Sequence, residues 1–348
     1  MKFTRLAATL CTALFLLPAI APAAGERQLT IINWEEFLDP VAIAAFEKRE
    51  GAKVVQVHFS TVEESLALSA KNIGKADIVV GGMVVTEQLK AKSLLQKLDR
   101  SKLPNLRHSL PQFRADPDYV APYLWGYTGL AWRTDKLKEP VDTYGKLLDL
   151  ARKNPGKVML TDDSMEFAHA VLMMYGKPPY NHDDLAAVKE ALAKYQAEGA
   201  KLFRIQESVY DKSWPLASGE AIAGQVYNGD IHFHREDSQA PLAYAQPKEG
   251  CFYWQENMML LAKAPQPELA LAFINYINGG KVAARNAESS NFASANPMAT
   301  QFYSKAFLDN PYVLPKLEGT ANCRVNKPLS PATQKFIDGL KPTGVNRS

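Results

Sequence analysis

The chain has 348 residues, of which 47% are hydrophobic, and a formal net charge of +3. This length is sufficient for two domains with sizeable cores. The small net charge, without any run of basic residues, argues against nucleic acid as a partner. We therefore expect a globular protein of two domains that acts on something other than nucleic acid.

Residues 1–24 have the pattern of a cleavable secretory signal peptide. Lys2 and Arg5 precede an apolar run over residues 6–20, and Ala21-Pro22-Ala23 offers a cleavage site of small residues. The run is too short, and too closely followed by that site, for a membrane anchor. Removing Lys2 and Arg5 lowers the net charge from +3 to +1. We expect an exported, soluble, periplasmic protein.

Two cysteines remain after such a cleavage, Cys251 and Cys323. In an oxidising compartment they could form a disulfide, and two free, buried thiols are the alternative. The loop closed by this disulfide would be long, so the stabilisation would be about 4 kcal/mol if the geometry permits the bond.

The first hundred residues after the signal alternate strands and helices. Apolar runs predict strands over residues 29–32, 53–59 and 77–80. Asp39 and Pro40 begin a helix that Gly51 ends, and Thr61-Val62-Glu63-Glu64 is a capping box at the start of the next. This order predicts a parallel sheet whose ligand crevice lies at residues 33–37 and 81–84.

A second α/β unit follows a strand over residues 128–133. Its predicted strands cover residues 158–160 and 222–227, its helices cover residues 165–175 and 185–198, and a strand over 252–261 returns to the first domain before a helix over 269–278. The predicted first lobe comprises residues 25–130 and 255–305, and the second comprises 131–254 and 306–348. Extended strands between the lobes favour a hinge.

Acidic and aromatic residues recur in four of the predicted strand regions. They are Trp34, Glu35, Glu36 and Phe37; Asp163 and Glu166; Tyr227 and Asp230; and Trp254 and Glu256. Trp254 and Glu256 alternate within a strand and so share a face. Carboxylates and aromatic faces suit a cationic ligand with an apolar body. Residue by residue, helix capping and core packing remain the alternatives.

Enzyme motifs are scarce. The sequence has no phosphate-binding Walker loop, no Gly-x-Ser-x-Gly elbow and no His-Glu-x-x-His motif. Asp163 and Glu166 could form an acid/base pair, but no nucleophile or oxyanion hole accompanies them. His232 and His234 could ligate a metal if the segment is extended, which is weak evidence for a metal-dependent periplasmic enzyme. We expect no catalysis, no metal and no cofactor.

These landmarks resemble those of the periplasmic polyamine-binding proteins, the spermidine/putrescine-binding components of ABC importers. The resemblance is carried by Asn33-Trp34-Glu35-Glu36, Pro122-Tyr123-Leu124-Trp125-Gly126, Leu160-Thr161-Asp162-Asp163, Tyr227-Asn228-Gly229-Asp230, and Pro247-Lys248-Glu249-Gly250 through Trp254-Gln255-Glu256. It implies the α/β fold of a type II periplasmic binding protein. In that fold each lobe is a mostly parallel sheet flanked by helices, and the ligand cleft lies at the hinge. The implied protein is a monomer whose partner is a membrane permease or, alternatively, a membrane sensor.

The resemblance also implies roles for the candidate residues. Trp34 would stack on the methylene chain of the ligand, and Glu36, with Glu35 as second candidate, would bind an amine. Asp163 and Glu166 would hold the end of a longer polyamine. Trp254 and Glu256 would clamp the centre of the ligand. Tyr227 stands where the family usually has tryptophan, and Asp230 matches an acidic position of putrescine-binding members.

Three positions depart from the family. Phe37 stands where tyrosine is usual, and Gly82 and Val84 stand where serine and tyrosine are usual. Each hydrogen bond lost to a charged amine would weaken binding by about 1.5–3 kcal/mol. Asp163 with Glu166 favours a triamine, whereas Asp230 favours a diamine. We expect a spermidine-like triamine to be preferred to putrescine.

Overall fold

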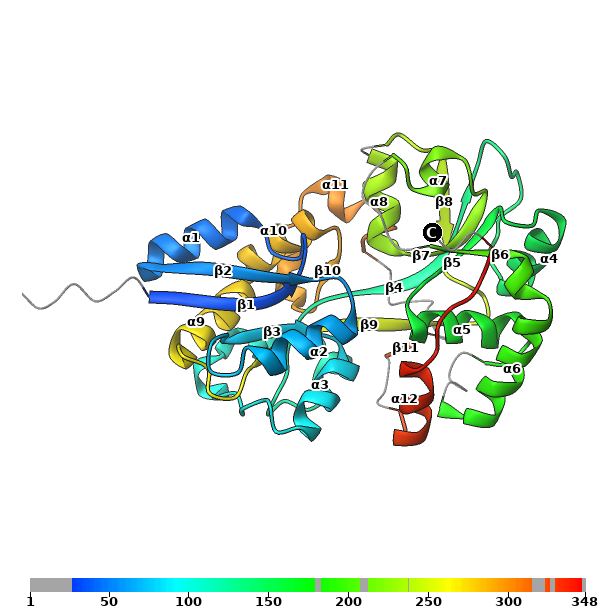
Figure 1. Ribbon diagram of the computed structural model, residues 1–348. Coiled ribbons are helices and arrows are strands. Elements are labelled where there is room, and N and C mark those ends of the chain that lie inside the picture. Colours follow the sequence, from blue (N-terminus) through cyan, green and yellow to red (C-terminus); the bar gives the residue numbers. More distant parts are fainter. Residues whose placement is uncertain are drawn as a thin grey trace, which may run out of the picture.

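Two lobes joined by long strands make up the computed structural model (Figure 1), which describes residues 27–178, 183–206, 212–236, 238–314, 323–325 and 329–345. The predicted signal peptide lies outside the described residues. Within these ranges, no helix is both long enough and apolar enough to cross a membrane.

The strands and helices alternate through most of the chain. The strands are β1 (Arg27–Trp34), β2 (Ala52–Phe59), β3 (Ile78–Gly81), β4 (Ala121–Arg133), β5 (Val158–Thr161), β6 (Phe203–Gln206), β7 (Ala223–Tyr227), β8 (Leu242–Ala245), β9 (Cys251–Leu260), β10 (Ala293–Ser294) and β11 (Cys323–Val325). The helices are α1 (Pro40–Glu50), α2 (Val62–Lys71), α3 (Met83–Ala91), α4 (Tyr144–Lys153), α5 (Ser164–Met174), α6 (Leu185–Ala197), α7 (Pro215–Ser218), α8 (Asn228–Glu236), α9 (Pro267–Ile277), α10 (Gly280–Ser290), α11 (Lys305–Leu308) and α12 (Pro331–Asp338).

The strands follow one another in the order β2-β1-β3-β9-β4-β7-β5-β6. The β2-β1-β3 group of the first lobe and the β6-β5-β7 group of the second are parallel, as predicted. The sheet is nevertheless mixed, because β9 runs antiparallel to both β3 and β4, and β4 runs antiparallel to β7. The long strands β4 and β9 pass from one lobe to the other (Figure 1), which matches the extended connections expected from the sequence.

Each lobe has its own apolar core. In the first lobe, β1 and β3 pack against helices α1 and α9, and in the second lobe β5 packs against α4, α5 and α6. Phe307 and Val313 pack into the core of the first lobe, although the predicted boundary placed them in the second. Their packing would extend the first lobe to about residue 314; the remaining lobe boundaries stay predictions.

The predicted disulfide is present between Cys251 and Cys323. Cys251 begins β9 and Cys323 begins β11, and the two residues are paired in the register of these parallel strands. The bond therefore fastens a C-terminal segment to a strand that passes between the lobes.

Candidate ligand-binding site

The last residue of β1 meets the middle of β9 between the lobes. The indole Nε1 of Trp34 donates a hydrogen bond to Oε2 of Glu256, at 3.2 Å. The Trp34 ring also packs against Phe59, the last residue of β2, with 4.4 Å between the ring centroids. Two of the predicted site residues, 222 positions apart in the chain, are thus in direct contact.

Trp254, two residues before Glu256 on β9, belongs to an aromatic wall. Its ring meets Phe292 edge-on at 4.8 Å and Tyr227 edge-on at 6.2 Å. Phe37 adds to the wall, with its ring 5.5 Å from that of Phe292. The Phe37 ring also lies 6.1 Å from that of Trp34, and its contact with a ligand stays a prediction.

Two glycines make room for this wall. A Cβ on Gly126 would lie 2.2 Å from Cζ2 of Trp254 and 2.4 Å from Oδ1 of Asn228. A Cβ on Gly229 would lie 2.3 Å from Cε1 of Phe292. All three separations are shorter than any normal contact of a Cβ atom. Any side chain at these two positions would therefore displace the aromatic wall.

Asp163 and Glu166 lie at the start of α5 in the second lobe. Asp163 is the N-cap of the helix, and its Oδ1 accepts the backbone N–H of Glu166 at 2.8 Å. Glu166 is buried, with its Oε2 3.9 Å from Nδ1 of His169. The His169 ring in turn stacks on Phe252 of β9, at 4.1 Å. Asp163 thus performs the capping role that its position predicted, and one of its carboxylate oxygens is used in doing so.

Tyr227 and Asp230 complete the second-lobe side. Tyr227 is the last residue of β7, and Asp230 is buried in the first turn of α8. Burial, and then the charges of Asp163, Glu166 and Asp230, raise the pKa of Tyr227 well above its ordinary value. The charges of these three carboxylates therefore act on the Tyr227 hydroxyl, and their common role in ligand binding stays a prediction.

Burial raises the pKa values of three of the predicted site carboxyl groups. It raises the pKa of Glu256 to about 8, although the hydrogen bond from Trp34 opposes the shift. It raises the pKa of Glu166 to about 7, and together with the charge of Glu166 it raises the pKa of Asp163 to about 6. A cation placed among these groups would favour their charged forms and relieve the repulsion between them.

Glu35 and Glu36 are placed differently. Both lie in an exposed turn after β1, where Glu36 has a left-handed φ of 64°. Among the described residues, neither carboxylate forms a hydrogen bond or an ion pair with another predicted site residue. Their role as amine partners stays a prediction.

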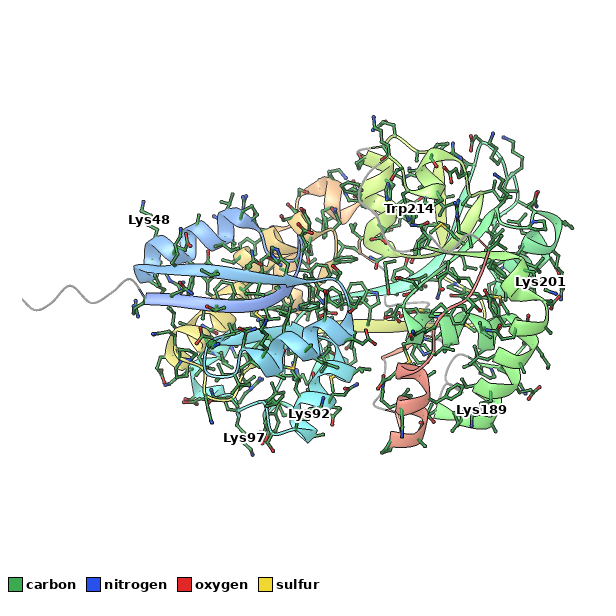
Figure 2. All side chains as sticks on the ribbon, viewed as in Figure 1. Lys48, Lys92, Lys97, Lys189, Lys201 and Trp214 are labelled. Atoms are coloured by element: carbon green, nitrogen blue, oxygen red, sulfur yellow. A yellow bond between two sulfur atoms is a disulfide. The ribbon has the colours of Figure 1, made fainter. Side chains whose placement is uncertain are left out.

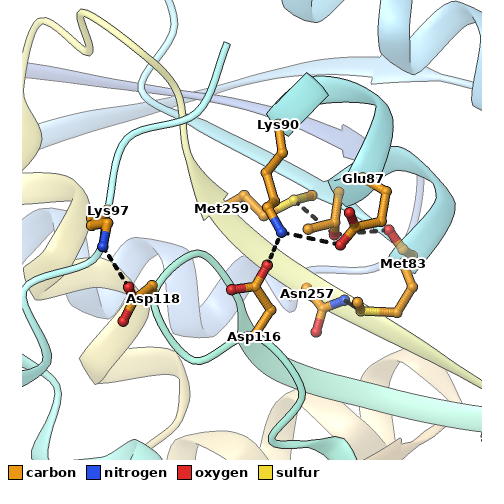
Figure 3. Close-up of polar contacts among 10 residues, drawn as sticks. Met83, Glu87, Lys90, Lys97, Asp116, Asp118, Asn257 and Met259 are labelled. Carbon is orange, nitrogen blue, oxygen red and sulfur yellow. Dashed lines mark hydrogen bonds and ion pairs between the residues drawn. The ribbon is translucent and has the colours of Figure 1, made fainter. Parts of the chain in front are cut away.

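Two lysines of the first lobe are engaged with acids of the same lobe. Lys90 on α3 pairs with Glu87 and Asp116, and Lys97 pairs with Asp118 (Figure 3). Figure 2 shows the labelled lysines at the outer margins of both lobes rather than between them. The labelled lysines thus lie away from Glu256, Glu166 and Asp230, whose side chains are buried.

The metal hypothesis required an extended segment at His232 and His234, and that requirement is not met. Both residues lie on helix α8, two positions apart, and so point to different sides of it. His234 is buried and stacks on Trp214 at 4.2 Å, whereas Nδ1 of His232 lies 2.7 Å from the amide nitrogen of Asn310. Among the described residues no group of three metal-ligating side chains is gathered.

Sequence reasoning missed Phe292, Gly126 and Gly229 as parts of this site. Phe292 follows α10 and does not lie at the end of a predicted strand. The search for acidic and aromatic residues at strand ends therefore did not select it. The two glycines stand inside segments quoted for the resemblance, and only the atoms around them reveal what they do.

Comparison with known proteins identifies the family. The model of the bacterial extracellular solute-binding proteins matches residues 41–314. The chain belongs to this family. Over 335 residues, this solute-binding protein is 27% identical to the putrescine/agmatine-binding protein of Pseudomonas aeruginosa, covering 90% of each chain. Over 296 residues it is 28% identical to the spermidine/putrescine-binding periplasmic protein of Salmonella typhimurium, covering 82% of each.

Solved structures establish the fold. A Listeria monocytogenes structure assigned to a spermidine/putrescine ABC transporter superposes with a TM-score of 0.79 at 25% identity, covering 90% of this chain and 97% of the other. A Streptococcus pneumoniae substrate-binding protein of a spermidine/putrescine ABC transporter has a TM-score of 0.76 at 20% identity, covering 90% and 97%. The fold is that of a type II periplasmic binding protein, and these relatives are substrate-binding transport proteins, not enzymes.

Proposed function

We propose that this solute-binding protein captures a polyamine in the periplasm and delivers it to the membrane permease of an ABC importer. The observation that carries the proposal is the buried Glu256 carboxylate, which is hydrogen-bonded to Trp34 and lies two residues from Trp254 on β9. The relatives named for putrescine and spermidine support the choice of ligand. The names of those relatives also support a periplasmic location.

The chemistry of the ligand matches these residues. An ammonium group donates charge-assisted hydrogen bonds to carboxylates, and a chain of methylenes packs against aromatic faces. In our proposal Glu256 binds an amine near the middle of the ligand, while Trp34 and Trp254 contact its methylenes. Burial disfavours the ionised forms of these carboxyl groups, and a bound ammonium restores them, so in our proposal ligand binding stabilises the closed arrangement of the lobes.

A triamine fits the distribution of acids better than a diamine. Glu256 stands on β9, whereas Asp163 and Glu166 stand together at the start of α5 in the second lobe. An extended ligand reaching from Glu256 to Asp163 needs amines at both places. We therefore propose that spermidine binds more tightly than putrescine, and that the protein binds it as a monomer.

Titration calorimetry with putrescine, cadaverine, spermidine, norspermidine and spermine tests this function. We expect saturable binding of one ligand per chain, with the triamines bound more tightly than the diamines. If none of the five produces heat of binding up to millimolar concentration, the polyamine proposal is wrong. If putrescine is the tightest ligand, the triamine preference is wrong and the function stands.

A further inference from the structure

The N-terminus of helix α2 lies on the side of the first lobe that is directed toward the second lobe (Figure 1). Its first residue, Val62, comes three residues after Phe59, which ends β2 and packs on the Trp34 ring. In Figure 1 this end of α2 is directed toward α5 of the second lobe. The first turn of α2 is therefore close to the proposed ligand site.

The two glutamates in this turn have different environments. Glu64 completes the capping box: its Oε2 accepts the N–H of Ser60 at 2.8 Å, and its own N–H donates to Oγ1 of Thr61 at 3.1 Å. Glu63 is exposed and takes no part in the cap. Within the described ranges the Glu63 carboxylate forms no hydrogen bond or ion pair, so it is available to a ligand.

The lobes approach each other along this edge. Nε2 of Gln88 on α3 donates to Oδ2 of Asp338 on α12, at 3.3 Å. Helix α12 packs on α5, and the hydroxyl of Ser164 donates to the carbonyl of Leu340 just beyond α12. A direct hydrogen bond thus connects the α2–α3 side of the first lobe with the α5 side of the second.

The carboxylates of Glu63 and Asp163 come from different lobes, and the charge of one influences the other. The charge of Glu63 is among the influences that raise the pKa of Asp163, after burial and the charge of Glu166. The two carboxylates are therefore near enough for the charge of one to disfavour ionisation of the other. A cation between them would turn their repulsion into attraction.

We propose that Glu63 is a ligand-binding carboxylate of the first lobe that shares the terminal ammonium of an extended polyamine with Asp163. The proposal rests on the polyamine function argued above. An ammonium group has three hydrogens to donate, and one Asp163 oxygen already accepts the N–H of Glu166. Glu63 supplies the additional acceptor. A diamine bound near Glu256 does not reach this pair, so Glu63 determines preference for longer ligands.

Two variants one residue apart test this role. Glu63→Gln and Glu64→Gln remove the same charge from the same helical turn, and glutamine can replace glutamate in a capping box. By titration calorimetry, we expect Glu63→Gln to weaken spermidine binding about tenfold. Its effect on putrescine should be less than about twofold, and Glu64→Gln should change either affinity by less than about twofold.

Each of the following outcomes either overturns or supports the role proposed for Glu63. Equal effects of the two variants on spermidine would show a general charge effect and overturn the proposal. Tighter spermidine binding by Glu63→Gln would show that Glu63 only repels Asp163, and would overturn it too. Weaker spermidine binding by Glu63→Gln alone, with putrescine binding retained, supports it. If the wild-type protein binds no polyamine, the function fails first and this inference fails with it.

Discussion

Binding of a polyamine should expel protons from the cleft. At pH 7 a carboxyl group with a pKa of about 8 is about nine-tenths protonated, and one with a pKa of about 7 is half protonated. The first value is that of Glu256, and the second is that of Glu166. Amines resembling that of lysine stay charged below about pH 10. Because a bound ammonium favours the ionised carboxylate, binding at pH 7 should release about one to one and a half protons per ligand.

The free energies follow from the same values. Ionising Glu256 at pH 7 costs about 1.4 kcal/mol, the equivalent of one pKa unit. Affinity should therefore rise between pH 6 and pH 8, as the carboxyl groups lose their protons before the ligand arrives. Glu256→Gln should release about one proton fewer at pH 7. It should also bind more weakly than wild type. The loss of affinity should be larger at pH 8, where ionising Glu256 costs the wild-type protein less free energy.

Titration calorimetry in buffers of different ionisation enthalpy measures this proton release. The slope of the apparent binding enthalpy against the buffer enthalpy gives the number of protons released. A slope of zero in the wild type, or an unchanged slope in Glu256→Gln, would refute the assignment of Glu256 as an amine-binding carboxylate.

Three further predictions concern the site and its stability. Glu256→Gln should weaken spermidine binding more than Glu35→Gln, because Glu256 is buried beside Trp34 and Glu35 is exposed; equal losses in calorimetry would contradict the placement of Glu256. Gly126→Ala should destabilise the fold by about 1–3 kcal/mol in urea unfolding, because its Cβ would overlap the indole of Trp254. Gly145→Ala, where a Cβ would lie 3.9 Å from the nearest atom, is the matched control and should change stability far less. Without ligand, stability should fall as pH rises from about 4.5 to 8, because the folded pKa of Glu256 is above the value of an unfolded glutamate; thermal unfolding of Glu256→Gln should show a shallower fall, and identical curves would argue against the raised pKa.

The strand ends could be predicted because local patterns determine them. Apolar runs identified β1, β5, β7 and β9, and parallel strand ends share one edge of a sheet. This reasoning anticipated that residues of β1, β7 and β9 meet, as in the contacts of Trp34 with Glu256 and of Tyr227 with Trp254; that Asp163 shares a ligand with them stays a prediction. Asp39 and Thr61 were recognised as helix caps for the same reason, since capping depends on residues within one turn.

Contacts between distant segments could not be predicted in this way. The antiparallel pairing of β4 with β7 and β9 joins strands that are about a hundred residues apart in the chain, and no local pattern encodes it. The contact between Phe292 and Trp254 joins residues from different elements. Likewise, the sequence His232-Phe233-His234 permits an extended or a helical conformation, and the surrounding structure selects the helix.

A crystal structure of the protein with spermidine tests the central claim most directly. We expect one ligand between the lobes, with its methylenes against Trp34 and Trp254, one amine on Glu256 and a terminal amine at Asp163. Spermidine bound only outside the cleft, or a cleft that stays empty at saturating spermidine, would contradict the account.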